Sequence, residues 1–180
     1  LIAVARAAGI IVTWDDFSEL SNAVPLLTRI YPNGSADINH FVAAGGMALL
    51  FKQLLDAGLI HNDVKTIVGD GLDLYTKEPA LEDGEVTWRD GPVKSHDTEV
   101  FASVEVPFKP DGGLNVLSGN LGRAVIKTSA LRNPHCTLKA PAVVFEDQYQ
   151  LDAAFKSGEL DKDCIVVVRF QGPAAIGMPE

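Results

Sequence analysis

The chain has 180 residues, of which 47% are hydrophobic and 22% charged, a composition typical of an ordinary globular protein and not of a disordered segment. Its formal net charge of -9 is spread along the chain without a basic stripe, which argues against nucleic acid and anionic membranes as partners. No apolar run approaches the roughly 20 residues that a membrane-spanning helix needs. Cys136 and Cys164 have neither zinc-site nor disulfide-framework spacing, and with no signal peptide in view we expect reduced thiols and a cytoplasmic protein.

Both ends of the sequence indicate a piece of a longer chain. The first residue is Leu1, and residues 1–9 resemble the last two turns of a helix that Gly9 closes, with no N-cap before them. The last residues, 177–180, form a Gly/Pro loop that ends on the carboxylate of Glu180. A strand that leads into such a loop is one way to present a ligand from a rigid scaffold, although a loop that simply ends in Glu is the plainer alternative.

The first half of the chain carries helix and turn signals. Thr13 and Asp16 have the spacing of a capping box and predict a helix start. The run of turn-forming residues 31–34 predicts a break, and residues 47–57 predict an amphipathic helix. Gly45-Gly46 before that helix either lets an anion approach bare N–H groups or permits close packing.

From about residue 93 the pattern changes to short β-type runs separated by Gly/Pro turns. A hairpin turned at Asp83-Gly84 precedes them, residues 148–156 predict one helix, and residues 165–170 predict a strand buried on both faces. The β-type runs lie at residues 100–106, 114–117, 124–127 and 142–145. Many short strands with one or two helices are typical of a closed or half-closed β-barrel.

Six blocks of the sequence together resemble one family. In chain order they are TWDDFSELSNAVPLL, YPNGSADINHFVAAGG, LLDAGLIHNDV, GGLNVLSGNLGRAVIKTSA, APAVVFED and VVVRFQGPAAIGMPE. They are similar to consecutive blocks of the dihydroxy-acid dehydratase and 6-phosphogluconate dehydratase family. The segments YPNGSADINHF, DLYTKEP and LSGNLGRAVIKTSA are more similar to the phosphogluconate branch.

The resemblance implies a mixed α/β fold in two parts. Residues 1–92 would be the C-terminal part of an α/β N-terminal domain, and residues 93–180 the first part of a β-barrel-like C-terminal domain with few helices. It also implies a hydro-lyase, which dehydrates 6-phospho-D-gluconate to 2-dehydro-3-deoxy-6-phosphogluconate in the Entner–Doudoroff pathway. The full-length protein would be a homodimer that binds this phosphorylated sugar acid.

The cofactors that the resemblance implies are an iron–sulfur cluster and a divalent metal, usually Mg²⁺. The GMPE block places the family's metal-ligating glutamate on Glu180, although Ala174-Ala175-Ile176 departs from the usual loop before it. The cluster cysteines and the catalytic serine would lie outside this sequence, since neither cysteine matches the family motifs. The branch-specific blocks suggest substrate contacts from five residues: Asn33, Asn39, His40, Asn120 and Arg123.

Two other interpretations stay open at this point. The first is another branch of the family, a dihydroxy-acid or sugar-acid dehydratase whose substrate carries no phosphate. The second is a module without catalytic activity that binds a sugar acid or serves as a scaffold. On the leading interpretation the 180 residues alone are inactive, because cluster and base are absent from them.

Overall fold

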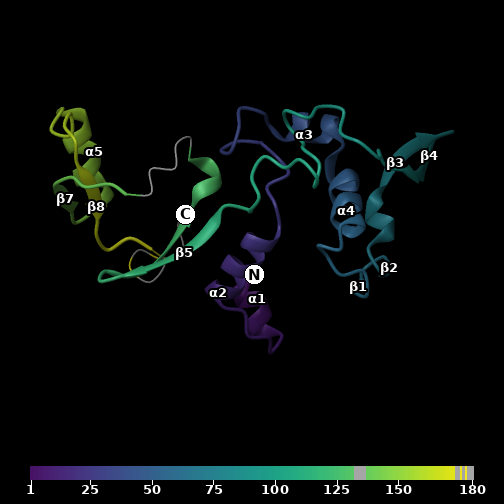
Figure 1. Cartoon of the computed structure of the whole chain (residues 1–180), viewed down its shortest axis with the longest axis horizontal. Helices are drawn as coiled ribbons and strands as arrows, with labels where there is room; N and C mark the ends of the chain where they lie inside the picture. The colour runs from purple at the N-terminus through teal and green to yellow at the C-terminus, as the bar shows by residue number, and fades with distance from the viewer. Residues whose placement is uncertain (132–136, 173–174, 176, 178–180) are drawn as a thin grey trace. The chain divides into compact units, whose positions relative to one another are not determined.

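The computed structural model describes residues 1–131, 137–172, 175 and 177, in two compact units, Leu1–Arg132 and Asn133–Glu180 (Figure 1). The described elements of the first unit are α1 (Ile2–Ala7), α2 (Trp14–Ala23), α3 (Ile38–Ala44), α4 (Gly46–Asp56), β1 (Lys65–Thr66), β2 (Gly69–Asp70), a 3₁₀ turn (Asp73–Thr76), β3 (Lys77–Glu82), β4 (Glu85–Asp90), β5 (Leu114–Gly119), β6 (Gly122–Lys127) and a second 3₁₀ turn (Thr128–Ala130). Those of the second unit are β7 (Ala142–Phe145), α5 (Gln148–Lys156) and β8 (Ile165–Val168).

Local sequence signals account for the helix starts. The Thr13 side chain and the Asp16 backbone and carboxylate form the predicted capping box at the start of α2. Gly45 precedes α4 with φ 138, and a Cβ at this position would lie 2.5 Å from Leu49 Cδ2. Gly45 therefore permits the Leu49 side chain to pack against the backbone, which supports the close-packing interpretation of the double glycine.

The strands that the structure describes form four two-stranded sheets. The pairs β1–β2, β3–β4 and β5–β6 are antiparallel, whereas β7 and β8 run parallel with Ala142 opposite Ile165. The mixed α/β class is thus confirmed, but no closed barrel occurs among the residues that the structure describes. The prediction that the last strand is buried on both faces is wrong: Ile165 and Val166 are 38% and 40% exposed, because β7 is the only described strand that pairs with β8.

The core of the first unit is built from segments far apart in sequence. Its buried members are Leu27, Phe41, Ala44, Leu49, Val100 and Phe101. The stretch that carries Leu27 is extended: Ala102 N donates to Leu27 O at 2.8 Å, and the rings of Phe41 and Phe101 stack at 5.8 Å. The strand predicted over residues 100–106 is reduced to a single bridge between Phe101 and Thr28, because the backbone bends at residues 104–106.

No single helix of the described part is long and apolar enough to cross a membrane. By length and composition, α3 and α4 meet the criterion only when taken together across a 58° bend.

Candidate functional site

A polar cavity of about 510 Å³ opens in the first unit beside the core. We call it the Arg29 pocket, and its polar lining consists of Arg29, Asn33, Ser35, Glu99, Lys109 and Ser129. These side chains come from four stretches of the chain that the sequence separates by up to 100 residues. The volume lies within the range of roughly 300–1,000 Å³ that is typical of small-molecule sites.

One wall of the pocket is the loop that contains Asn33. Tyr31 N donates to Ala36 O at 2.8 Å and Asn33 N to Ile30 O at 2.8 Å, so the loop closes on itself. Gly34 lies so close to the preceding stretch that a Cβ there would be 2.6 Å from Arg29 O. The sequence Tyr-Pro-Asn-Gly thus forms the predicted turn, and the glycine is required because the backbones approach closely.

A second part of the wall is formed by Lys109 and by the turn after β6. Lys109 O accepts from Leu26 N at 3.0 Å, and the Lys109 Nζ donates to Thr128 O at 2.8 Å. Gly113 O accepts from Thr128 N at 2.6 Å. These bonds position the buried Ser129, whose Oγ donates to Asn33 Oδ1 at 3.2 Å. The Asn33–Ser129 contact joins the two parts of the wall.

The charge inside the Arg29 pocket is set by three side chains. Arg29 places its guanidinium carbon 4.2 Å from the centre of the Phe108 ring, a cation–π geometry that orients the plane of the group. Within the described part of the chain, the ion pairs include neither Arg29 nor Lys109. Glu99 contributes one negative charge, so two cations and one anion leave the lining net positive.

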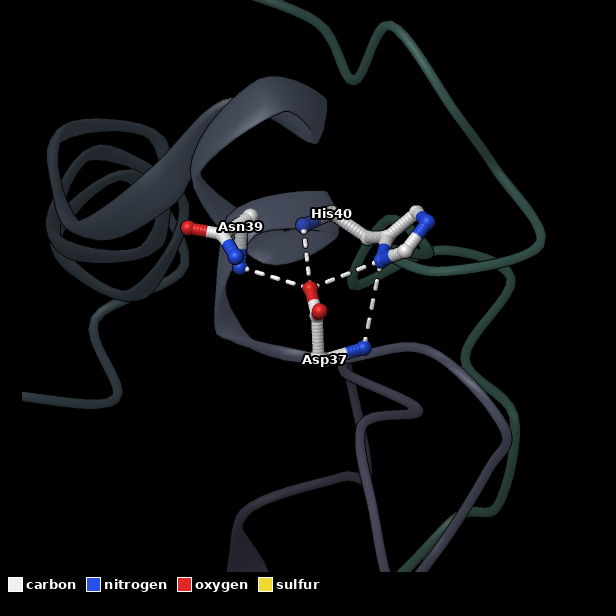
Figure 2. A network of polar contacts seen from close by, with 3 residues as sticks. All are labelled: Asp37, Asn39 and His40. Atoms are coloured by element: carbon white, nitrogen blue, oxygen red, sulfur yellow. Dashed lines mark hydrogen bonds and ion pairs between the residues drawn. The ribbon is translucent and has the colours of Figure 1, made fainter.

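The structure brings Asn39 and His40 together at the start of α3, where Asp37 is the N-cap (Figure 2). Asp37 Oδ1 accepts from Asn39 N at 2.8 Å and from His40 N at 3.1 Å, and it lies 2.7 Å from His40 Nδ1. The pKa of Asp37 lies below its ordinary value, chiefly because the His40 backbone N–H donates to it and then because of the His40 side chain. Asp37 N also lies 3.3 Å from His40 Nδ1. This ring nitrogen cannot accept a hydrogen bond from Asp37 N and at the same time donate one to the Asp37 carboxylate. The shorter contact favours an Nδ1–H that donates to Asp37.

The structure places Asn120 and Arg123 elsewhere, on the β5–β6 hairpin. Asn120 is exposed in its turn, and Arg123 Nη2 donates to Asp15 Oδ1 of α2 at 2.6 Å. Arg123, Asp15 and Glu19 line a second cavity of about 490 Å³, which we call the Arg123 pocket. Its two carboxylates outweigh the one guanidinium.

Comparison with known protein families divides the chain at a different place from the two compact units. Residues 1–75 match the model of the dihydroxy-acid/6-phosphogluconate dehydratase N-terminal domain, and residues 99–180 match that of the C-terminal domain. The chain belongs to the dihydroxy-acid/6-phosphogluconate dehydratase family.

Several family members are similar to the chain over its whole length. It is 60% identical over 180 residues to the phosphogluconate dehydratase of Escherichia coli K12 and 57% identical to that of Pseudomonas aeruginosa, covering 30% of each. Over 175 residues, 96% of the chain and 29% of the relative, it is 35% identical to the dihydroxy-acid dehydratase of Roseiflexus castenholzii. The chain thus spans about 30% of the length of the curated relatives it matches.

The metal and the cluster of this family find no ligand set in the described residues. No group of three or more His, Cys, Asp or Glu side chains there is arranged to hold a metal ion. Cys164 is free and half-buried, whereas Cys136 and Glu180 lie outside the described residues.

Of the five residues predicted to contact a substrate of this family, only Asn33 lines the Arg29 pocket. The sequence did not predict that Arg29, Lys109 or Ser129 would line a site. Two signals were available: Arg29 lies two residues before the YPNG turn, and Ser129 lies inside the LSGNLGRAVIKTSA block. Nothing local distinguishes Lys109, because its place in the pocket depends on its pairing with Leu26.

Proposed function

We propose that the chain is part of an enzyme that dehydrates 6-phospho-D-gluconate to 2-dehydro-3-deoxy-6-phosphogluconate, a step of the Entner–Doudoroff pathway. The observation that carries the proposal is the difference in identity between the branches. Relatives named phosphogluconate dehydratase are 46–60% identical over the chain, whereas the relative named dihydroxy-acid dehydratase is 35% identical. In the reaction the C2 proton and the C3 hydroxyl leave, and the resulting enol rearranges to a 2-oxo acid.

The same proposal assigns the domains and the cofactors. Residues 1–92 belong to the N-terminal domain and residues 93–180 to a β-barrel-like C-terminal domain, a border supported by family matches that end at residue 75 and resume at residue 99. The complete enzyme is a cytoplasmic homodimer that uses an iron–sulfur cluster and Mg²⁺. A hard divalent cation favours carboxylate oxygen, which is what Glu180 would supply to the Mg²⁺.

The proposed substrate contacts differ in the support that the geometry gives them. Asn33 has the strongest, since it lies in a polar pocket with two cations. His40 and Asn39 occupy an exposed helix start whose polar groups engage Asp37, and Arg123 engages Asp15. Asn120 is exposed in a hairpin turn. The five remain proposed contacts, and a smaller contribution to binding is expected from the four that lie outside the Arg29 pocket.

The test is an anaerobic assay of the full-length enzyme that contains this chain, with iron, sulfide and Mg²⁺ supplied. We expect 2-oxo acid to form from 6-phosphogluconate at a much higher kcat/KM than from gluconate or from a 2,3-dihydroxy acid with a branched alkyl chain. The 180-residue chain assayed in parallel should give no product. Equal turnover of the unphosphorylated substrates would show that the branch is wrongly assigned.

A further inference from the structure

We infer that the Arg29 pocket binds the phosphate group of the substrate, with Arg29, Lys109 and Asn33 as the donors. The inference rests on the proposed function for the identity of the substrate. What it adds is the location of the phosphate within the fold and the residues that recognise it. Two of these three residues came from the structure and not from the sequence blocks.

The first reason is electrostatic. A phosphate monoester carries about -1.5 to -2 charges at neutral pH, and the chain as a whole carries -9. Binding it therefore requires a local excess of positive charge, which Arg29 and Lys109 supply against the single carboxylate of Glu99. The Arg123 pocket has the opposite balance, because Asp15 and Glu19 face one guanidinium.

The second reason is the number of donors still available. Lys109 Nζ donates one of its three hydrogens to Thr128 O, so two remain for a ligand. Asn33 Oδ1 accepts from Ser129, so its amide hydrogens remain, and within the described residues no acceptor takes them. Arg29 offers a guanidinium fork oriented by the Phe108 ring.

The third reason is preorganisation. Three donors, Arg29 and Asn33 from one stretch and Lys109 from another, match the three terminal oxygens of a phosphate better than the two oxygens of a carboxylate. The stretches are tied together by the Asn33–Ser129 bond at 3.2 Å and by the Lys109–Thr128 bond at 2.8 Å. Side chains fixed before binding lose little conformational entropy when the ligand arrives.

The experiment measures binding by calorimetry in the full-length enzyme, with 6-phosphogluconate, gluconate and inorganic phosphate as ligands. For Lys109→Met and Arg29→Leu we expect the Kd of 6-phosphogluconate and of inorganic phosphate to rise roughly 10- to 100-fold, as for a lost charge-assisted hydrogen bond. The Kd of gluconate should stay within about twofold. Lys162→Met, which removes an exposed lysine in the second unit, is the charge-matched control and should leave all three values unchanged.

Glu99→Gln tests the same pocket in the opposite direction. Removing this carboxylate should lower the Kd of 6-phosphogluconate roughly two- to fivefold, the range expected for an exposed charge pair. The variant retains the size of the side chain, so it also answers the concern that Lys109→Met perturbs folding through the lost Thr128 bond.

The inference is overturned if Lys109→Met and Arg29→Leu weaken gluconate and 6-phosphogluconate equally, or if Glu99→Gln leaves 6-phosphogluconate binding unchanged. If the substitutions change the Kd of the phosphorylated ligands but the unmodified enzyme forms no 2-oxo acid, the result supports the pocket and contradicts the proposed reaction. Turnover of 6-phosphogluconate with a Kd insensitive to all three substitutions would support the reaction and contradict the pocket.

Discussion

The Arg29 pocket and the Arg123 pocket are nearly equal in volume, about 510 and 490 Å³, and each contains one arginine. In the Arg29 pocket, the guanidinium of Arg29 lies over the Phe108 ring and Lys109 lines the same cavity. In the Arg123 pocket, the guanidinium of Arg123 donates to Asp15 Oδ1 at 2.6 Å. Both arginines lie in or beside sequence blocks typical of the phosphogluconate branch. The difference shows that an arginine's availability to a ligand is decided by the charges that the fold brings to it.

The two pockets also differ in how deeply the residues beside each arginine are buried. The stretch that carries Arg29 adjoins the buried Leu27 and pairs with residues 100–102 of the core. Arg123 lies on a hairpin where Leu117 and Val125 are 50% and 45% exposed. We therefore expect the Arg29 pocket to depend on core packing and the Arg123 pocket to be insensitive to it.

The largest effect should come from Phe101→Ala. Phe101 is fully buried and stacks on Phe41, so its truncation should cost about 3–5 kcal/mol. Hydrogen exchange of the full-length enzyme should show the loss at the Arg29 and Ala102 amides, which bond across this core. The matched control is Val125→Ala on β6, expected to change stability by less than about 0.5 kcal/mol. Equal losses of stability for both variants would show that the two pockets do not differ in their dependence on core packing.

The two arginines can be compared directly. Arg29→Leu keeps an apolar side chain over Phe108 but removes the charge, and kcat/KM for 6-phosphogluconate should fall roughly 10- to 100-fold. Arg123→Leu removes an exposed ion pair and should change kcat/KM by less than about fivefold. Steady-state kinetics on both variants decides the matter. A larger loss for Arg123→Leu would assign the phosphate to the hairpin instead.

Elements with local signals were predictable from the sequence. The helix at residues 148–156 and the strand at residues 142–145 have the predicted bounds, because Asp147 caps the helix and a run of β-branched residues forms the strand. The capping box of Thr13 and Asp16 was predictable for the same reason. In each case the residues that determine the element lie within a few positions of it.

The Arg29 pocket was not predictable, because its residues meet only through long-range pairing. Ser129 reaches Asn33 across 96 positions, and Lys109 reaches Leu26 through an isolated bridge. No periodicity marks such contacts, and a lone arginine or lysine is most often solvated. For the same reason, the ion pair between Arg123 and Asp15, which lie 108 positions apart, could not be predicted from the sequence.

A glycine in each region gives the next comparison. A Cβ on Gly113 would lie 2.5 Å from Ser129 N, and its φ is 75, so Gly113→Ala should destabilise the turn that positions Ser129 by about 1–3 kcal/mol. Gly119 on the hairpin has nothing within 4 Å of its Cβ position, and Gly119→Ala should be nearly neutral. Hydrogen exchange at the Thr128 amide, which bonds to Gly113 O, reports the difference. Protection at Thr128 that is equal in the two variants would show that the turn adjusts freely.

The smallest effect should be an acid response that the two regions share. The pKa of Asp37 at the start of α3 and that of Asp16 at the start of α2 both lie below 3.8, in each case chiefly because a backbone N–H donates to the carboxylate, from His40 and from Thr13 respectively. A depressed folded-state pKa contributes stability that is present above the unfolded value and is lost as the pH falls through the folded value. Both helix starts should therefore keep their protection above about pH 4 and lose it together below that, when hydrogen exchange is corrected for its intrinsic pH dependence. Asp37→Asn should remove the response at α3 alone, since an asparagine still caps the helix but does not titrate in this range. An acid response that persists at α3 in this variant would mean that another group in the core region titrates there, and that the two regions differ in charge at low pH as well as at neutral pH.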